Sequence, residues 1–252
     1  SDDALWLVPS IVEYIKETGE MSLLDEVVTY ADGGEGTVYE HMTRILDFSA
    51  QQVGATGICK GLRADWNDCL NLGGGESAMV SFLHYWAIQN FLEVAERSGK
   101  TEDIEKYRRM AEKVRAACDA ELWDGKWYMR ALSQVENIGS KDSDGSKIYL
   151  NAQTWAVLAE IVPPERMADV VASVDGMEGD FGFPLNMPAY EKYSPNVGRM
   201  SGMLPGLFEN GGVYCHATSF KIFMDCKLGR ANKAIRTLKK IMPDSEQNPS
   251  SN

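Results

Sequence analysis

Two carboxylates around a tryptophan and an asparagine form the segment of the chain best suited to chemistry. Asp65, Trp66, Asn67 and Asp68 follow one another, and glycines 73–75 come directly before a strongly apolar stretch. Cleavage of a glycosidic bond needs a proton for the leaving oxygen, and the sugar usually lies against an aromatic side chain. These residues could supply both, so they predict a loop that holds a sugar.

The two carboxylates differ in how well a purely structural role explains them. An aspartate can cap the structure that follows it, and a tryptophan can simply pack. For Asp65 a structural and a functional role explain the sequence equally well. For Asp68 the functional role is favoured, mainly because of the resemblance described below.

Several other segments resemble known motifs but lack residues that those motifs require. Glycines 73–75 lack the following Lys-Ser/Thr and the preceding βαβ pattern of a phosphate or dinucleotide loop. Residues 142–145 open like a calcium loop, but the glycine is fourth instead of sixth and Gln153 stands where a glutamate is required. His41 and His84 lie in helical segments without a metal-like partner at i+4. The sequence therefore predicts no metal site.

Composition narrows the class of protein and its partners. The 252 residues suffice for one large domain or two small ones. With 37 acidic and 25 basic residues the net charge is −12, which argues against nucleic acid and suits a neutral carbohydrate. No apolar stretch reaches the ~20 residues of a membrane span, and no signal peptide is visible. Five scattered cysteines suggest reduced thiols and a cytoplasmic location.

Helices must position the sugar-binding loop. Apolar residues at helical spacing predict helices over residues 5–16 up to Gly19, after Thr37, from about 76 to 98, from a cap at Thr101, over 151–161, after Pro164, and over 216–228 and 231–241. Residues 127–132 predict a short strand or hairpin in a loop, and 142–147 and 180–202 are long excursions of a kind that is often functional. Helix pairs joined by elaborate loops predict an all-α, layered or toroidal architecture.

Three blocks resemble the inverting β-glycoside phosphorylases of glycoside hydrolase family 94, which act on cellobiose, cellodextrins, chitobiose or cellobionic acid. The blocks are residues 1–7 (Ser-Asp-Asp-Ala-Leu-Trp-Leu), 63–76 around Asp68, and 209–216 (Glu-Asn-Gly-Gly-Val-Tyr-Cys-His). The resemblance covers essentially the whole chain. It implies an (α/α)6 toroid of the six-hairpin glycosidase type, here a partial barrel with long loops and a small β excursion.

The resemblance also implies a reaction. Inorganic phosphate, as co-substrate and without any cofactor, attacks the anomeric carbon of a non-reducing glucosyl unit. The products are α-glucose 1-phosphate and a shortened acceptor, and the reaction is reversible. Asp68 matches the family's general acid, which leaves Asp65 without a role as a second catalytic carboxylate.

Further roles follow from the same matching. Trp66 would form a wall of the donor-sugar site, and Asp3, with Asp2 less closely matched, would hydrogen-bond the donor sugar. Asn67 and Arg63 are also expected to contact substrate, although Arg63 is chosen on charge alone. Both Asp2 and Asp3 precede a helix and could equally be caps.

The third block would supply the remaining contacts. Glu209 would line the subsites near the cleaved bond and His216 would contact phosphate, and neither residue has an obvious packing role. Arg199 is a second positive neighbour for phosphate on charge alone. Phe208 stands where cellobiose phosphorylases often carry lysine, and this argues against a strict disaccharide enzyme and favours a cellodextrin.

Family members are much longer than this chain. They carry an N-terminal β-sandwich and a C-terminal Thr-Gly element of the phosphate pocket, so residues 1–252 are expected to be part of the catalytic barrel. For the full-length protein a homodimer is a candidate assembly. Two alternatives stay open. An inverting hydrolase would need a base ~6.5–9.5 Å from Asp68, and an inactive fragment would bind sugar without turnover.

Overall fold

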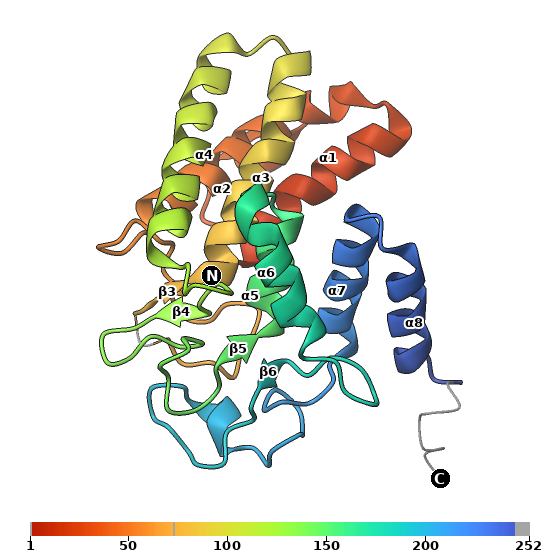
Figure 1. The fold of residues 1–252 in the computed structure, drawn as a ribbon. Helices are drawn as coiled ribbons and strands as arrows, with labels where there is room; N and C mark the ends of the chain where they lie inside the picture. Colours follow the sequence, from red (N-terminus) through yellow and green to blue (C-terminus); the bar gives the residue numbers. More distant parts are fainter. Residues whose placement is uncertain (1, 73, 245–252) are drawn as a thin grey trace.

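The computed structural model describes residues 2–72 and 74–244, and within them eight α-helices form four consecutive hairpins (Figure 1). Ser1 of the first block, Gly73 of the glycine run and residues 245–252 lie outside the described residues. The helices are α1 (Leu7–Thr18), α2 (Val38–Gln51), α3 (Ala78–Arg97), α4 (Thr101–Glu121), α5 (Leu150–Leu158), α6 (Pro164–Asp175), α7 (Cys215–Lys227) and α8 (Ala231–Ile241).

The odd-numbered helices form an inner layer. Helix α1 packs against α3, α3 against α5, and α5 against α7, whereas α4, α6 and α8 each pack on the helix that precedes them. An even-numbered helix returns the chain after each inner helix, so the inner helices all begin at the same end of the molecule. Loops and short strands gather at that end (Figure 1). This arrangement confirms the predicted all-α toroid, present here as four hairpins in the described part of the chain.

Helix ends follow their local sequence in most places. Thr37 caps α2 in a capping box with Glu40, and α1 ends at Gly19, whose φ is 74°. Thr101 differs from the prediction, because it is the first residue of α4 and Lys100 holds the cap position. Helix α5 also ends earlier than predicted, and Glu160 just beyond it has a φ of 59°.

Of the three small antiparallel sheets in the described residues, two lie at the loop end of the toroid, directly before α3 and α5, and the third joins the opposite end of α1 to α2. Strand β1 (Val27–Thr29) pairs with β2 (Glu35–Thr37), β3 (Glu76–Ser77) with β4 (Ala131–Leu132), and β5 (Ile148–Tyr149) with β6 (Asn186–Met187). The predicted strand over 127–132 is therefore only the two residues of β4, and the β1–β2 hairpin was not predicted. Three 3-10 helices complete the list: η1 (Asp3–Trp6), η2 (Met21–Asp25) and η3 (Arg199–Gly202).

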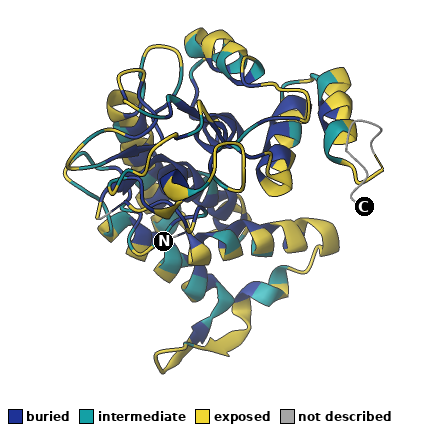
Figure 2. Cartoon of the chain, turned by 90° about the horizontal axis from the view of Figure 1, so that it is seen from below, coloured by how far each residue is buried: buried dark blue, intermediate teal, exposed yellow. Residues whose placement is uncertain are grey.

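The core lies between the inner helices, which carry more buried residues than the outer helices, whose outward faces are exposed (Figure 2). Helix α3 is buried on nearly all sides, in keeping with the strongly apolar stretch that follows glycines 73–75. His84 on α3 is fully buried, and this burial lowers the pKa of its ring to about 4. His41 is on the surface and contacts the Val28 carbonyl, so both histidines have structural surroundings. Within the described residues, no helix combines the length and apolarity needed to cross a bilayer.

Candidate active site

The three sequence blocks meet at the end where the inner helices begin. The first block leads into α1, the second into α3 and the third into α7. An aromatic chain joins them: Trp6 stacks on Phe220 at 6.2 Å between ring centroids, and Phe220 meets Trp66 edge-on at 6.1 Å. Asp2 is tied to the same chain, because its carboxylate accepts a hydrogen bond of 2.8 Å from Trp6 Nε1.

Trp66 links the second block to the third. Its indole Nε1 donates to His216 Nδ1 at 3.1 Å, and its ring meets Tyr214 edge-on at a centroid distance of 5.7 Å. His216 lies in the first turn of α7, four residues before Phe220, and the two rings are 4.7 Å apart. Trp66 and His216, 150 positions apart in sequence, therefore form one unit.

Asp65 is a buried anchor of the loop. Its carboxylate makes a two-pronged ion pair with Arg130 at 2.7 and 2.8 Å, and the two side chains are 0% and 2% exposed. Ser77 Oγ donates to it at 2.7 Å while capping α3 through Val80 N–H. Burial alone would raise the pKa of Asp65, but the charge and hydrogen bonds of Arg130, with help from Ser77, hold it below its usual range. Asp65 is thus fixed in a structural role.

Asn67 turns the chain so that Asp68 points outward. The Asn67 N–H donates to Asp65 at 2.9 Å, and the Asn67 side-chain oxygen accepts from Cys69 N–H at 3.0 Å. Asn67 is buried, whereas Asp68 is exposed. These short-range bonds are typical of an Asx turn. The structure gives Asn67 the task of shaping the loop, and a direct contact with substrate stays a prediction.

Residues 194–203 pack directly against the loop. Asn71 N–H donates to the Val197 carbonyl at 2.9 Å, and Met200 N–H donates to the Cys69 carbonyl at 3.0 Å. Gly198 makes this approach possible, since it has a φ of 85° and a Cβ there would lie 2.6 Å from Asn71 Cβ. The predicted excursion over 180–202 therefore braces the acid-bearing loop.

The third block is a tight turn built around Asn210. The buried Asn210 side chain accepts from Tyr190 N–H at 2.7 Å and donates to the Tyr190 and Met203 carbonyls at 2.8 Å each. Phe208 has a φ of 49°, and Gly212 comes so close to it that a Cβ would lie 2.4 Å from the Phe208 carbonyl oxygen. This strained turn fixes where Glu209 lies.

A cleft of about 630 Å³ collects the charged side chains of these loops. It is lined by Asp68, Cys69, Tyr193, Arg199, Gly202, Met203, Phe208 and Glu209. Burial raises the pKa of the Cys69 thiol, and the charge of Glu209 and a hydrogen bond to it add to the effect. An acid, a second carboxylate and a guanidinium thus share one solvent-accessible cleft with apolar walls.

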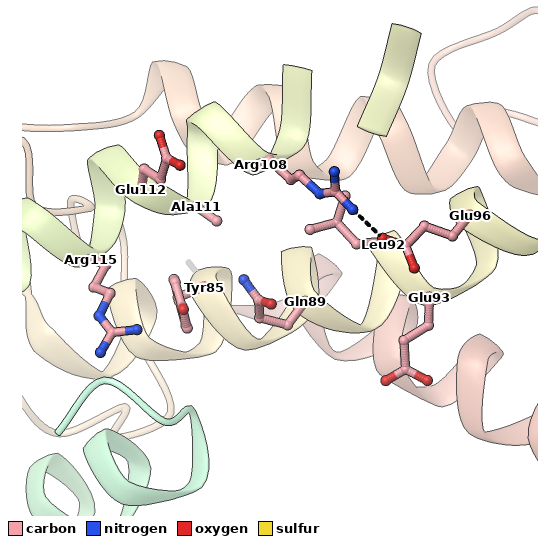
Figure 3. Close-up of a pocket in the computed structure, with 9 residues that line it drawn as sticks. All are labelled: Tyr85, Gln89, Leu92, Glu93, Glu96, Arg108, Ala111, Glu112 and Arg115. Carbon is pink, nitrogen blue, oxygen red and sulfur yellow. Dashed lines mark hydrogen bonds and ion pairs between the residues drawn. The ribbon is translucent and has the colours of Figure 1, made fainter. Parts of the chain in front are cut away.

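A second groove lies between α3 and α4, away from this end (Figure 3). Its residues come from positions 85–96 of α3 and 108–115 of α4, and the Arg108–Glu96 ion pair of 2.6 Å crosses it. None of the three sequence blocks contributes to its lining. The 630 Å³ cleft is therefore the candidate active site.

Comparison with known families decides the affiliation. The family model described as "Glycosyl hydrolase 94 superfamily, catalytic domain" matches residues 1–251. The chain belongs to this family. The affiliation confirms the resemblance seen in the three blocks.

Several named relatives of this glycosyl hydrolase 94 domain are phosphorylases. N,N'-diacetylchitobiose phosphorylase of Vibrio proteolyticus is 45% identical over 96% of this chain and 31% of its own length. Solabiose phosphorylase of Paenibacillus borealis is 39% identical over 99% of this chain and 34% of its own length. The chain thus spans about a third of the curated relatives it matches.

Solved structures support the fold of the glycosyl hydrolase 94 domain. A rhamnosidase from Klebsiella oxytoca with rhamnose bound superposes with a TM-score of 0.62 and 16% identity, over 93% of this chain and 36% of that one. A GH78 family rhamnosidase of Bacillus sp. GL1 gives a TM-score of 0.65 at 13% identity, over 98% and 23%. These enzymes share the six-hairpin toroid, and the likeness shows the fold alone.

The other predicted residues of the glycosyl hydrolase 94 domain lie at the loop end or near it. Asp2 is buried, which raises its pKa, although the Trp6 hydrogen bond opposes the shift; Asp3 is exposed at the start of η1. Arg63 is exposed and does not line the cleft, whereas Arg199 does. The predicted contacts of all four with substrate or phosphate stay predictions.

Sequence reasoning missed several residues of the site. Arg130 went unnoticed, although a lone arginine among the apolar residues 127–132 signals a buried charge with a partner. Tyr193 and Met203 line the cleft but match no motif, and nothing in their local sequence distinguishes them from ordinary loop residues. Cys69 also lines the cleft; it lies in the second block but was not singled out.

Proposed function

We propose that this chain forms the core of an enzyme that cleaves a β-glycosidic bond by phosphorolysis with inversion. The observation that carries the proposal is the hydrogen bond of 3.1 Å from Trp66 to His216. Trp66 is two positions before Asp68 in the sequence. The hydrogen bond joins an aromatic side chain suited to a sugar with an imidazole suited to phosphate. The family affiliation and the phosphorylase names of the relatives support the same reaction.

In the proposed reaction Asp68 is the general acid. Its protonated carboxyl gives a proton to the glycosidic oxygen as the bond from that oxygen to the anomeric carbon breaks. A phosphate oxygen forms the new bond to the same carbon from the opposite face, and α-sugar 1-phosphate and the free acceptor result. One carboxylate suffices, because phosphate replaces the water that an inverting hydrolase must activate with a base.

Phosphate is proposed to bind at the start of α7. His216 lies in its first turn, and no described side chain caps the backbone at Tyr214, which leaves the first N–H groups of α7 open to an anion. A chain with a net charge of −12 needs such a locally favourable site for an anionic co-substrate. Arg63 and Arg199 are further candidates for phosphate contacts.

The donor sugar is proposed to lie against Trp66, with Asp3 and Asp2 as hydrogen-bond partners. Trp66 is half-buried, so part of its ring is available to a ligand. An ionised carboxylate accepts hydrogen bonds at both of its oxygens, which suits the hydroxyl groups of a sugar. Glu209 lines the same cleft as Asp68 and is proposed to contact the sugar units that flank the cleaved bond.

For the substrate we place N,N'-diacetylchitobiose first, because two relatives at 45% identity carry that name. The apolar cleft walls formed by Tyr193, Met203 and Phe208 suit an acetamido methyl group. The cellodextrin favoured from sequence finds no support in the names of the relatives reported above. A cellodextrin stays an alternative substrate. Another cavity, of about 710 Å³, shares Tyr193 with the 630 Å³ cleft and could hold further acceptor units.

The proposal is tested by incubating the protein with N,N'-diacetylchitobiose, cellobiose or cellotriose, with and without phosphate. We expect sugar 1-phosphate only when phosphate is present, with the chitobiose derivative as the best substrate. Asp68→Asn should slow the reaction by about 10²–10⁴-fold, whereas Asp142→Asn, a change of an exposed aspartate outside the cleft, should leave the rate unchanged. A best rate with cellotriose would reinstate the cellodextrin.

An inverting hydrolase is the second candidate function. Glu209 shares the cleft with Asp68 and could act as the base that activates water. Hydrolysis would be favoured over phosphorolysis if reducing sugar were released at the same rate without phosphate and this release were lost in Glu209→Gln.

A further inference from the structure

We propose that Trp66 is also a positioning residue, which fixes the tautomer of His216 so that the ring offers an N–H to phosphate. The phosphate part of this inference rests on the proposed function. The tautomer itself follows from the hydrogen bond between the two side chains.

The direction of that hydrogen bond leaves one assignment for the neutral ring. The indole Nε1 of Trp66 carries a hydrogen and no available lone pair, so it can only donate. His216 Nδ1, 3.1 Å away, must therefore accept and cannot carry a proton. A neutral His216 then has its proton on Nε2.

Packing holds both rings in this arrangement. Trp66 meets Tyr214 edge-on at 5.7 Å and Phe220 edge-on at 6.1 Å, which limits its rotation. The His216 ring lies 4.7 Å from Phe220 and 5.4 Å from Trp66, measured between centroids. The Nδ1 contact is thus built into the aromatic cluster that joins the three sequence blocks.

The second ring nitrogen is the one available to a ligand. Within residues 2–72 and 74–244, His216 Nε2 has no hydrogen-bond partner, and the side chain is exposed at the start of α7. The unprotonated oxygens of phosphate accept hydrogen bonds, so the Nε2–H tautomer can donate to the oxygens that carry the negative charge. The opposite tautomer would present a lone pair, which is repelled by these oxygens.

Trp66 therefore links the two substrates. A sugar that stacks on the indole and a phosphate that binds Nε2 both favour the same paired orientation of Trp66 and His216. Because such coupling is reciprocal, sugar binding is expected to strengthen phosphate binding and the reverse.

The direct test is the 15N spectrum of the histidine rings at about pH 8.5, well above the ordinary pKa of histidine. The chain has three histidines, so the His216 signals are identified by their loss in His216→Asn. We expect an unprotonated Nδ1 and a protonated Nε2 in the wild type. Trp66→Phe keeps an aromatic wall but removes the donor, and should give a mixture of tautomers.

Tyr214→Leu is the matched control, because it removes another ring from the same cluster and leaves the donor in place. It should leave the His216 tautomer unchanged. In the kinetic arm, Trp66→Phe should raise the KM for phosphate about two- to tenfold, the value of one ordinary hydrogen bond. This change should exceed the change in kcat.

A wild-type spectrum with the proton on Nδ1, or a His216 spectrum unchanged by Trp66→Phe, would overturn the inference. An unchanged KM for phosphate in Trp66→Phe would overturn its functional part. If the wild type forms no sugar 1-phosphate, the proposed function fails, and the spectrum still decides the positioning by Trp66.

Discussion

Loss of the Arg130 guanidinium is predicted to cost far more stability than loss of any surface arginine. Arg130→Met removes the two-pronged partner of Asp65, whose carboxylate is 0% exposed and would be left without an opposite charge in a buried site. Breaking a buried ion pair by removing one member typically costs about 3–5 kcal/mol. A domain of this kind has about 5–15 kcal/mol in total, so the loss would be a large part of it.

The control is Arg109→Met. Arg109 also pairs with a carboxylate, Glu105, at 2.9 Å, but the two side chains are 64% and 65% exposed. Its loss should change the free energy of unfolding by no more than about 0.5 kcal/mol. The double variant Arg130→Met/Asp65→Asn should recover part of the loss, because no unpaired charge remains buried.

The assay is urea unfolding followed by circular dichroism, repeated as the pH is lowered. Arg130 holds the pKa of Asp65 below its ordinary value of 3.8 against the opposing effect of burial. The pair therefore stabilises the fold at neutral pH, and its contribution fades as the pH falls below 3.8 through the lowered value. The gap between wild type and Arg130→Met should narrow accordingly. A gap as small as that of Arg109→Met at pH 7 would refute the reasoning.

Three further predictions concern the same end of the molecule and its helices. Asp68→Asn should lower kcat by about 10²–10⁴ while the urea midpoint stays unchanged; a lowered midpoint would mean that the exposed Asp68 has a structural role. Gly198→Ala should lower the free energy of unfolding by about 1–3 kcal/mol, because φ is 85° and the new Cβ would approach Asn71, and Gly202→Ala, at a glycine without positive φ, should cost less. Thr37→Ala should cost about 1 kcal/mol in urea unfolding through loss of the α2 cap, and a neutral result would mean that Glu40 alone suffices.

Much of the fold was predictable because each helix has its own signal in the sequence. The apolar stripe of α3, the capping box at Thr37 and the terminal Gly19 depend on residues within one turn of each other. The start of α4 was misplaced by one residue, since Thr101 has the residue type of a cap but lies inside the helix. Such local signals fix helix existence better than helix ends.

The site was predictable only in part, since its geometry depends on contacts between distant segments. Spacing alone could not show that Asp65 pairs with Arg130, 65 positions away, or that Trp66 donates to His216, 150 positions away. The hydrogen bonds by which Asn67 turns the loop were not foreseen, and its expected contact with substrate stays a prediction. A short polar side chain in a loop has the same sequence signature in both roles.

The central claim is that Asp68 protonates the leaving oxygen while phosphate attacks the anomeric carbon. It is tested most directly by following the reaction of N,N'-diacetylchitobiose and phosphate by proton NMR, with Asp68→Asn in parallel. The account predicts that the first product is the α-anomer of the sugar 1-phosphate, formed by the wild type and not by the variant. A β-anomer, free sugar without phosphate consumption, or an active Asp68→Asn would contradict it.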